Sequence, residues 1–372
     1  MKSKLLIKKR DLFLYVELII IFSIIKNSGS GKYLIFLLWV IYHLFNKKLS
    51  INKNSSYILM PIYFCVGIGL FTSFLTNVTF NTFKEVVFIA LSPIGALVLW
   101  DSIPKEKTNY YINIMFKAIT VVFLIGGIRR FDLNNLMESS YAFVYGVFVI
   151  YYFYQKEKKM LLLSVLMLVL ANKRIALGAA LISVIVVIII DKKKSTRAPN
   201  FKKMIRIVRC LGIITTIGAV FYVYLCKTNI ISNIMTQFNL NSMGRLAAWL
   251  KLNSFYEVSI KQIGYGLGSV AGLLREVELS EIHFERLHND ILVYYIELGF
   301  LGFVIYIYSY FEMIVVFIKK KIINYKKIVI LCSFIIYHLI CFCTDNISIY
   351  INYLFPMYFV MCNVVFGVDP EK

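Results

Sequence analysis

Charged residues are scarce in this sequence of 372 residues. Only 16% of the chain is Asp, Glu, Lys or Arg, whereas 59% is hydrophobic and the mean hydropathy is +0.74. A soluble domain could not cover so much apolar surface with polar groups, so the soluble classes are excluded. The apolar residues gather in runs that lipid forces into helices, because lipid offers backbone groups no partner. We expect an all-α polytopic integral membrane protein without strands.

Several chemical signatures are also missing. The seven cysteines form no CxxC pair and mostly lie inside apolar segments, which predicts neither a disulfide framework nor a zinc site. Phosphate-binding and dinucleotide-binding loops, the HExxH metal motif and the nucleophile elbow do not occur. We therefore expect no cofactor. The basic N-terminus is followed by an apolar run without a small-residue cleavage site, so this run is interpreted as a retained first span.

Acidic residues are half as frequent as basic ones, with 20 Asp and Glu against 41 Lys and Arg. A net charge of +21 would suggest nucleic acid as the partner of a soluble protein, but here the basic residues cluster in short gaps between apolar segments. Cytoplasmic retention of Lys and Arg explains this pattern as membrane topology. No nucleic-acid partner is expected.

About twelve apolar segments are expected to cross the membrane as helices. They lie at residues 12–25, 33–46, 57–76, 86–100, 108–127, 139–155, 160–171, 175–190, 207–226, 289–318, 328–343 and 347–366. With a cytoplasmic N-terminus, 26 of the 41 basic residues fall in inside gaps, 13 in outside gaps, and Lys117 and Arg209 within segments. We predict cytoplasmic termini, an N-terminal bundle of about nine helices (1–226), a large extracytoplasmic loop with short helices (227–288) and a C-terminal bundle of about three (289–372).

The stretch from Met160 to Ile190 is interrupted by Asn172, Lys173 and Arg174. If it were one helix, the most basic run of the chain, KKKSTRAPNFKKMIR, would lie outside the membrane, against the positive-inside rule. Two short helices are therefore preferred. Because a helix of 12 residues is only about 18 Å long, Arg174 is expected below the outer surface, in a watered cavity lined by protein.

Arginine distinguishes the outside gaps from the inside gaps, where lysine dominates. The outside group comprises Arg129, Arg130, Lys173, Arg174, Arg245, Arg275, Arg286, His283 and His288. The planar fork of arginine binds phosphate through two hydrogen bonds, whereas lysine acts as a point charge. This bias predicts an anion site on the outward face.

Short motifs in and near the long loop follow a definite order. They are Gly244-Arg245 with Trp249, GYGLGS at 264–269, His288-Asn289-Asp290 and Glu297-Leu298-Gly299-Phe300-Leu301-Gly302, preceded by the looser Ile128-Arg129-Arg130-Phe131 and Asn172-Lys173-Arg174-Ile175-Ala176. Over residues 125–305 this order resembles the O-antigen ligase and O-antigen polymerase superfamily of bacterial membrane glycosyltransferases. The Arg-x10-Gly signature of some polymerases is absent. GYGLGS is predicted to be a tight turn whose glycines let the backbone approach a ligand or another helix.

This resemblance implies glycosyl transfer from an undecaprenyl diphosphate-linked donor on the outer face of the bacterial cytoplasmic membrane, without metal or nucleotide. The preferred acceptor is a lipid-linked repeat unit, which would make the protein an O-antigen or capsule polymerase. Other membrane proteins of polysaccharide assembly are further expected partners. The competing functions are an O-antigen ligase with a lipid A core acceptor and a polysaccharide flippase or transporter. The transporter is disfavoured because the halves show no evident symmetry and the distinctive polar residues concentrate in one loop.

The chemistry of this reaction suggests a role for each motif residue. Oriented cations stabilise the charge that a diphosphate gains in the transition state, and a histidine suits the acceptor hydroxyl as general base at neutral pH. We expect His288, Arg245 and Arg174 to be catalytic, and Arg129, Arg130, Lys173, Trp249 and Asp290 to bind substrate, with no metal ligand. Whether Lys173 or Arg174 is the primary cation stays open.

The end of the loop also allows purely structural roles. His288 could instead cap the helix that begins near Asn289. Glu297 lies nine residues after His288, about 180° round a helix, and shares its face with Asp290. A direct carboxylate partner for His288 is therefore not expected from Glu297, which is interpreted as structural.

The cations and the tryptophan of the motifs could likewise be structural. Arg245 could pair with Glu257 or Glu276 on the loop surface, and Arg174 could be an interfacial anchor. Trp249, one helical turn beyond Arg245, could be a sugar-stacking platform or an interfacial anchor, and the anchor is preferred.

Overall fold

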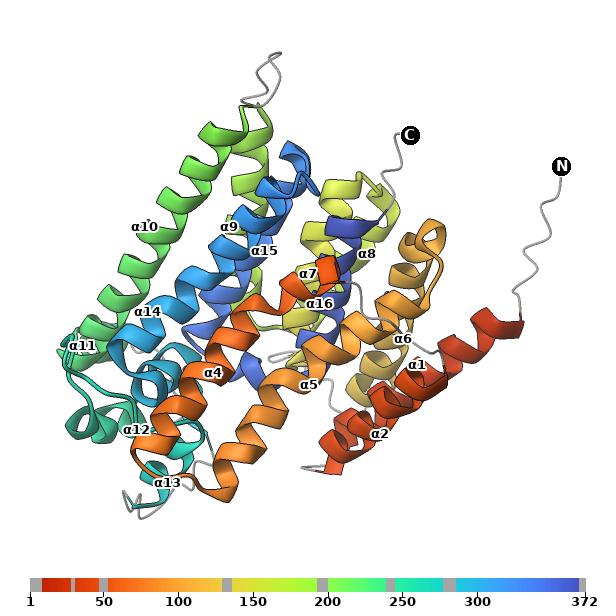
Figure 1. Ribbon diagram of the computed structural model, residues 1–372. Helices are drawn as coiled ribbons and strands as arrows, with labels where there is room; N and C mark the ends of the chain where they lie inside the picture. Colours follow the sequence, from red (N-terminus) through yellow and green to blue (C-terminus); the bar gives the residue numbers. More distant parts are fainter. Residues whose placement is uncertain are drawn as a thin grey trace, which may run out of the picture. The chain divides into compact units, whose positions relative to one another are not determined.

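The computed structural model describes residues 9–27, 31–46, 53–128, 136–192, 200–238, 245–276 and 286–367. Within these ranges the named elements are α-helices and short 3-10 helices (Figure 1). This result confirms the all-α class expected from the apolar runs. The short elements α3 (Lys53–Ser56), η1 (Tyr57–Leu59), η2 (Lys105–Lys107) and η4 (Ile347–Ile349) flank longer helices.

Each apolar segment expected to span the membrane coincides with a helix. These are α1 (Lys9–Asn27), α2 (Gly31–Asn46), α4 (Met60–Leu75), α5 (Phe80–Ser102), α6 (Thr108–Ile128), α7 (Tyr141–Gln155), α8 (Lys158–Leu170), α9 (Arg174–Lys192), α10 (Phe201–Lys227), α14 (Asp290–Lys319), α15 (Tyr325–Phe342) and α16 (Ile351–Phe366). Among the described residues, 6 helical stretches are long and apolar enough to cross a membrane, and shorter apolar stretches lie at Phe13–Ile25, Gly31–Phe45, Arg174–Ile189 and Ile351–Phe366. The chain is a multi-pass membrane protein, and twelve crossings stay a prediction.

The stretch from Met160 to Ile190 forms two helices, as preferred from the charge pattern. Helix α8 ends at Leu170 and α9 begins at Arg174. Asn172 between them has a φ of 43°, in the left-handed region that asparagine tolerates better than most residues. Its backbone N–H donates to the Val169 carbonyl at 3.1 Å, which closes the turn.

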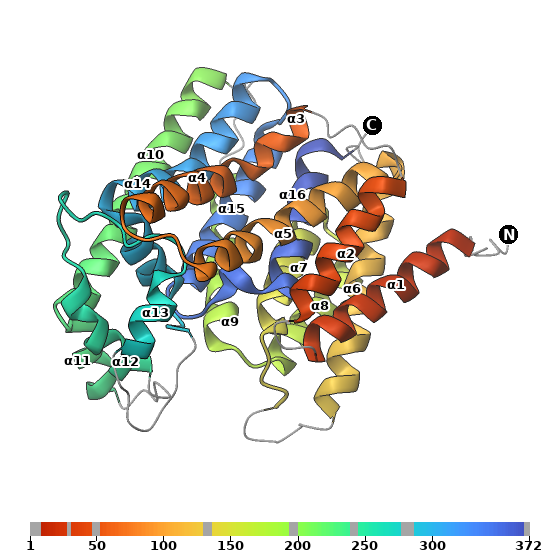
Figure 2. The same ribbon diagram turned by 60° about the horizontal axis from the view of Figure 1, so that its bottom comes forward.

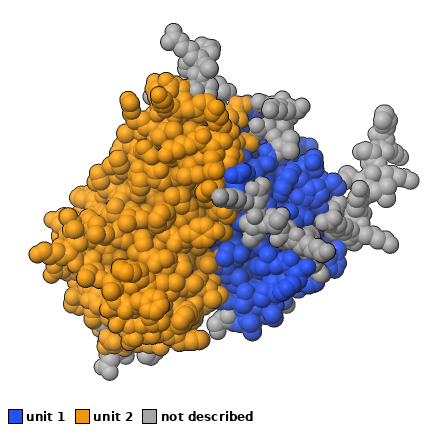
Figure 3. Space-filling model, viewed as in Figure 1, with its two compact units in different colours: residues 1–55, 91–184, 350–372 blue, residues 56–90, 185–349 orange. Residues whose placement is uncertain are grey.

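The chain divides into two compact units whose segments interleave along the sequence (Figure 3). Unit 1 comprises residues 1–55, 91–184 and 350–372, and unit 2 comprises residues 56–90 and 185–349. The predicted division at residues 227 and 289 describes the order of spans along the chain rather than these units, and it stays a prediction.

Unit 1 is built around α7, which packs against α8 and α16, while α1 packs against α2 and α6. Every residue of α7 from Tyr141 to Tyr152 is buried, as expected for a helix that is apolar around its whole circumference. Two of its phenols are satisfied by asparagines of α6. Tyr151 donates to Asn109 at 2.7 Å, and Tyr152 donates to Asn113 at 2.8 Å.

Unit 2 is built around α14, which packs against α10, α4 and α15 (Figures 1 and 2). The long loop between α10 and α14 contains α11 (Ile230–Gln237), α12 (Arg245–Leu252), η3 (Asn253–Phe255) and α13 (Ser269–Glu276). Helices α11, α12 and α13 gather near the end of α10 that leads into the loop (Figure 2). The loop therefore forms short helices, as the sequence suggested.

Helix α14 differs from the uninterrupted span expected at 289–318. Gly299 has φ 72° and ψ 177°, so the helix breaks there. A side chain would not fit at this position, because a Cβ would lie 2.5 Å from the Gly264 nitrogen. The part from Phe300 to Lys319 is about 30 Å long, which is one full crossing of the hydrocarbon core. The nine residues before Gly299 lead from this part of the helix to the loop.

Candidate functional site

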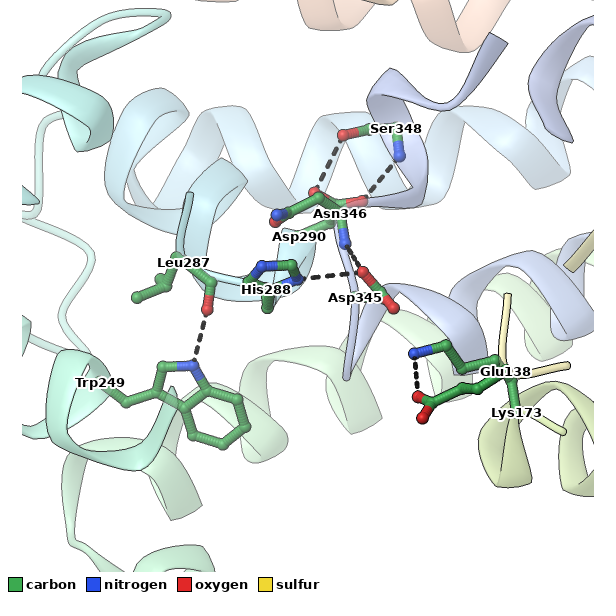
Figure 4. Close-up of polar contacts among 9 residues, drawn as sticks. All are labelled: Glu138, Lys173, Trp249, Leu287, His288, Asp290, Asp345, Asn346 and Ser348. Atoms are coloured by element: carbon green, nitrogen blue, oxygen red, sulfur yellow. Dashed lines mark hydrogen bonds and ion pairs between the residues drawn. The ribbon is translucent and has the colours of Figure 1, made fainter. Parts of the chain in front are cut away.

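His288 stands at the junction between the long loop and α14. The N-cap of this helix is Asn289, whose side-chain oxygen accepts a hydrogen bond from Leu292 N–H at 3.1 Å. His288 is therefore not the cap, and the capping role considered for it is wrong. Its φ of 53° lies in the left-handed region, where histidine is among the few side chains that occur with any frequency. The turn directs the imidazole toward the segment after α15 (Figure 4).

The imidazole of His288 pairs with a buried carboxylate. Its Nδ1 lies 3.1 Å from Oδ1 of Asp345, and the side chains are 31% and 5% exposed, respectively. An ionised Asp345 carboxylate can only accept hydrogen bonds, and beside it a neutral imidazole carries its hydrogen on Nδ1 and a lone pair on Nε2. No described residue bonds to Nε2. This is the arrangement of a general base oriented by a third group.

Asp345 was not predicted from the sequence as a site residue. It follows α15 in the short polar stretch Thr344-Asp345-Asn346, and its Oδ1 also accepts Asn346 N–H at 2.8 Å. A usable signal was present, because the predicted topology assigns the gap between 343 and 347 to the same side of the membrane as the loop that ends at His288. Helical spacing around His288 could not reveal this partner, because Asp345 lies on a different segment.

The two residues before His288 are each held by a contact with another part of the chain. Trp249 Nε1 donates to the Leu287 carbonyl at 3.0 Å (Figure 4). Arg286 forms an ion pair of 2.8 Å with Glu85, so this outside arginine is already partnered. Trp249 is only 7% exposed. Its ring packs inside the unit and positions the backbone before His288, while a substrate-binding role for it stays a prediction.

The carboxylate of Asp290 is bonded within the protein, and its predicted contact with substrate stays a prediction. Asp290 is buried, and its two carboxylate oxygens accept hydrogen bonds from the backbone N–H and the hydroxyl of Ser348, at 2.8 and 2.9 Å (Figure 4). These bonds tie the start of α14 to η4, close in sequence to Asp345. The geometry fits a role in holding the two segments together.

The Gly-rich turn approaches another helix, one of the two options expected for it. Glu297 is buried, and its Oε1 accepts the N–H groups of Gly268 at 2.9 Å and Val270 at 3.3 Å, at the start of α13. A Cβ on Gly264 would lie 2.2 Å from the Glu297 carbonyl oxygen, so the backbones are in direct contact. These contacts agree with the interpretation of Glu297 as structural.

Lys227, the cation at the base of the loop, is bonded to backbone carbonyl groups. Lys227 Nζ donates to the carbonyl oxygens of Asn253 and Tyr256, the latter at 2.6 Å. The Tyr256 hydroxyl donates to Asn253 Oδ1 at 2.8 Å. Burial raises the pKa of the Tyr256 phenol, so it remains a neutral donor. Lys227 therefore fastens the loop to α10 and is not available to an anion.

The hairpin cations Lys173 and Arg174 belong to unit 1 and behave differently from each other. Lys173 Nζ forms an ion pair of 2.8 Å with Glu138 (Figure 4). Arg174, the first residue of α9, is exposed and makes no hydrogen bond or ion pair within the described part of the chain. Of the two, Arg174 is the cation that stays available.

Some expected site residues lie outside the described residues. Arg129, Arg130 and His283 fall in such stretches, and for Arg245 only the backbone is described, as the first residue of α12. The possible pairing of Arg245 with Glu257 or Glu276 is therefore untested. Within the described ranges, no group of three or more His, Cys, Asp or Glu side chains is placed to hold a metal ion.

Fold and site together define a multi-pass membrane protein with a histidine and carboxylate pair at the base of a large polar loop. The profile of the O-antigen ligase family, Wzy_C, matches residues 160–307. The chain therefore contains a domain of this family, whose membrane enzymes transfer glycans in polysaccharide and cell-envelope assembly. This match confirms the resemblance seen in the motifs and implies lipid-linked glycan substrates. No curated protein and no solved structure matches the chain.

Proposed function

We propose that the protein is a polysaccharide polymerase that transfers a glycan from an undecaprenyl diphosphate-linked donor to a hydroxyl of a lipid-linked repeat unit. The observation that supports this proposal most directly is the pair of His288 and Asp345 next to the long loop. A partly exposed imidazole nitrogen, held by a buried carboxylate, is suited to accept the proton of a sugar hydroxyl.

In the proposed step the acceptor oxygen attacks the anomeric carbon of the donor sugar. The bond from that carbon to the phosphate oxygen breaks, and undecaprenyl diphosphate leaves with the electron pair. Nε2 of His288 takes the proton of the acceptor hydroxyl. Asp345 keeps the imidazole in the required tautomer and stabilises the imidazolium that forms, as the aspartate of a catalytic triad does.

The leaving diphosphate needs cations that are free to bind it. Arg174 is proposed for this role because it is exposed and unpartnered within the described residues, whereas Lys173 is held by Glu138. Arg245 is proposed from its place in the family motif. Arg129 and Arg130 stay proposed substrate-binding residues on the same ground, and both lie outside the described residues.

The proposed site faces away from the cytoplasm, and both termini are cytoplasmic. The support is the excess of Lys and Arg in the inside gaps. Ser254 is an exposed residue of the loop, so a cysteine at this position is expected to react with a membrane-impermeant maleimide added to intact cells. Reaction only after the cells are permeabilised would reverse the proposed orientation.

The identity of the acceptor is tested by measuring glycan transfer with purified protein in liposomes that contain the lipid-linked repeat unit. A polymerase is expected to produce a ladder of longer glycans that remain on the lipid diphosphate, together with free undecaprenyl diphosphate. A ligase would instead transfer the glycan only when a lipid A core oligosaccharide is supplied. Movement of the lipid-linked unit across the bilayer without any new glycosidic bond would identify a flippase and reject the proposal.

A further inference from the structure

An unusual turn lies in the loop between η3 and the Gly-rich segment. The Ser259 carbonyl accepts the N–H of Gln262 at 3.0 Å, which places Ile260 and Lys261 at the tip of a four-residue turn. Turn tips usually carry Gly, Pro, Asn, Asp or Ser. Here Ile260 is 70% exposed, and Ile263 directly after the turn is 64% exposed. Two large aliphatic side chains on an ordered turn indicate that something other than water covers them.

The level of this turn along α14 is set by direct backbone contacts. Ile263 forms a β-bridge with Gly299, and Phe300 N–H donates to the Gln262 carbonyl at 3.1 Å. Helix α14 from Phe300 to Lys319 is about 30 Å long, the thickness of the hydrocarbon core of a bilayer. If this part of α14 makes the crossing, Ile263 lies at the edge of the hydrocarbon core.

The same segment also lies against the end of α4, a second candidate span. The Thr76 hydroxyl donates to the Tyr265 carbonyl at 2.9 Å, and Leu267 N–H donates to Ser73 Oγ at 3.0 Å. The neighbouring helix ends carry large apolar side chains that are exposed on unit 2. These are Phe71, Phe74 and Leu75 on α4, Phe80 and Phe83 on α5, and Leu301 and Ile305 on α14. Ile263 thus continues an apolar surface that the spans present to lipid.

The backbone of the segment meets the condition for lying at this depth. Non-helical backbone at membrane depth is tolerated only where protein or water satisfies its polar groups. Within the turn, Lys261 N–H donates to Ser259 Oγ at 3.2 Å and Gln262 N–H to the Ser259 carbonyl at 3.0 Å. Directly after it, Tyr265 N–H donates to the Ile296 carbonyl at 3.0 Å. Lys261 is exposed at the tip, and its long stem allows the ammonium group to reach the phosphate level of the bilayer.

We propose that residues 259–263 form a membrane-contacting turn, in which Ile260 and Ile263 insert among the acyl chains of the leaflet on the loop side while Lys261 remains at the headgroups. The proposed occupant of this apolar surface is bulk phospholipid. The inference does not depend on the acceptor of the glycan or on the orientation of the protein. It requires only that α4 and α14 cross the bilayer.

The test uses a nitroxide label on Ile263→Cys in the full-length protein, with Cys210→Ser as background because Cys210 is the exposed cysteine among the seven. The protein is placed in nanodiscs of phosphatidylethanolamine and phosphatidylglycerol that contain no polyprenyl lipid. The label is expected to collide more often with oxygen, which concentrates in acyl chains, than with a water-soluble nickel chelate. Ile260→Cys is a second site with the same expectation.

The matched control is Ser254→Cys, an exposed polar position in the same loop, where the nickel chelate should be the more effective relaxant. Equal accessibility profiles at positions 263 and 254 would overturn the proposal, and so would a water-exposed profile at both 260 and 263. If the label at 263 becomes lipid-like only after undecaprenyl phosphate is added, the surface receives a polyprenyl chain and the bilayer proposal is wrong.

Discussion

The His288 segment and the α8–α9 hairpin differ in how many of their residues are held by a hydrogen-bond or ion-pair partner. Around His288, each consecutive position is held by a partner distant in sequence: Arg286 by Glu85, Leu287 by Trp249, His288 by Asp345, Asn289 by Tyr222 and Asp290 by Ser348. In the hairpin, Lys173 has one ion-pair partner, and Arg174 has none within the described part of the chain.

This difference follows from what each region is proposed to do. A general base must be within hydrogen-bond reach of one particular proton, so its backbone and its ring must both be fixed in position. An arginine that binds a diphosphate acts through its charge and through paired N–H donors of its guanidinium group. It must not be bound to a protein carboxylate before the substrate arrives. The rigid region therefore suits proton transfer, and the open one suits phosphate binding.

The largest effect is expected for His288→Ala. A positioned base contributes about 10² to 10⁴ in rate, so glycan transfer should fall by that factor while the lipid-linked donor still binds. The rate is measured with purified protein at matched concentration, and donor binding is measured separately. His283→Ala serves as the control and is expected to be mild. A stable His288→Ala protein with normal activity would remove the general base, and with it the contrast between the two regions.

Arg174→Lys is also expected to lower glycan transfer. Loss of one donor to a developing charge typically lowers the rate by about 10² to 10³, and lysine cannot restore the two-pronged contact. Glycan transfer is measured at saturating donor. Arg275→Lys, at another exposed arginine of the described loop, is the control and should retain near wild-type activity.

Asp345→Asn tests the orienting role, because the base remains and only the carboxylate that holds its tautomer is lost; glycan transfer is expected to fall by up to about 10⁴ if the asparagine reverses the tautomer. A second readout separates orientation from folding. The midpoint of thermal unfolding is measured beside the rate, and it should stay close to the wild-type value while glycan transfer falls. A rate that falls only together with the unfolding midpoint would mean that Asp345 only supports the fold.

Lys173→Met is expected to have the smallest effect, and it decides which hairpin cation matters. Its pair with Glu138 is partly exposed, and such pairs contribute about 0 to 1 kcal/mol to stability. The variant should therefore fold and keep most of its glycan-transfer activity. If Lys173→Met lost as much activity as Arg174→Lys, the assignment of the free cation would have to be exchanged.

Local patterns in the sequence were sufficient for much of the architecture. Hydropathy placed a helix at each apolar segment, and the charged interruption at Asn172 to Arg174 indicated a hairpin rather than one helix. The order of motifs from Arg174 to Gly302 identified the family whose profile covers residues 160–307. These features depend on residues close together in the chain, or on their order, and both can be read without knowing how the helices pack.

Tertiary structure alone decided what surrounds the candidate site. His288 and Asp345 are 57 residues apart, and Arg286 and Glu85 are 201 apart, so no periodicity links them. The break at Gly299 arises because the Gly-rich turn occupies the space a side chain would need, and the burial of Trp249 arises because its ring bonds to the backbone before His288. The sequence determined which segments form apolar helices, since hydropathy and helical length depend on each segment separately. Which polar groups meet depends on packing between distant segments, and only the folded structure decides that.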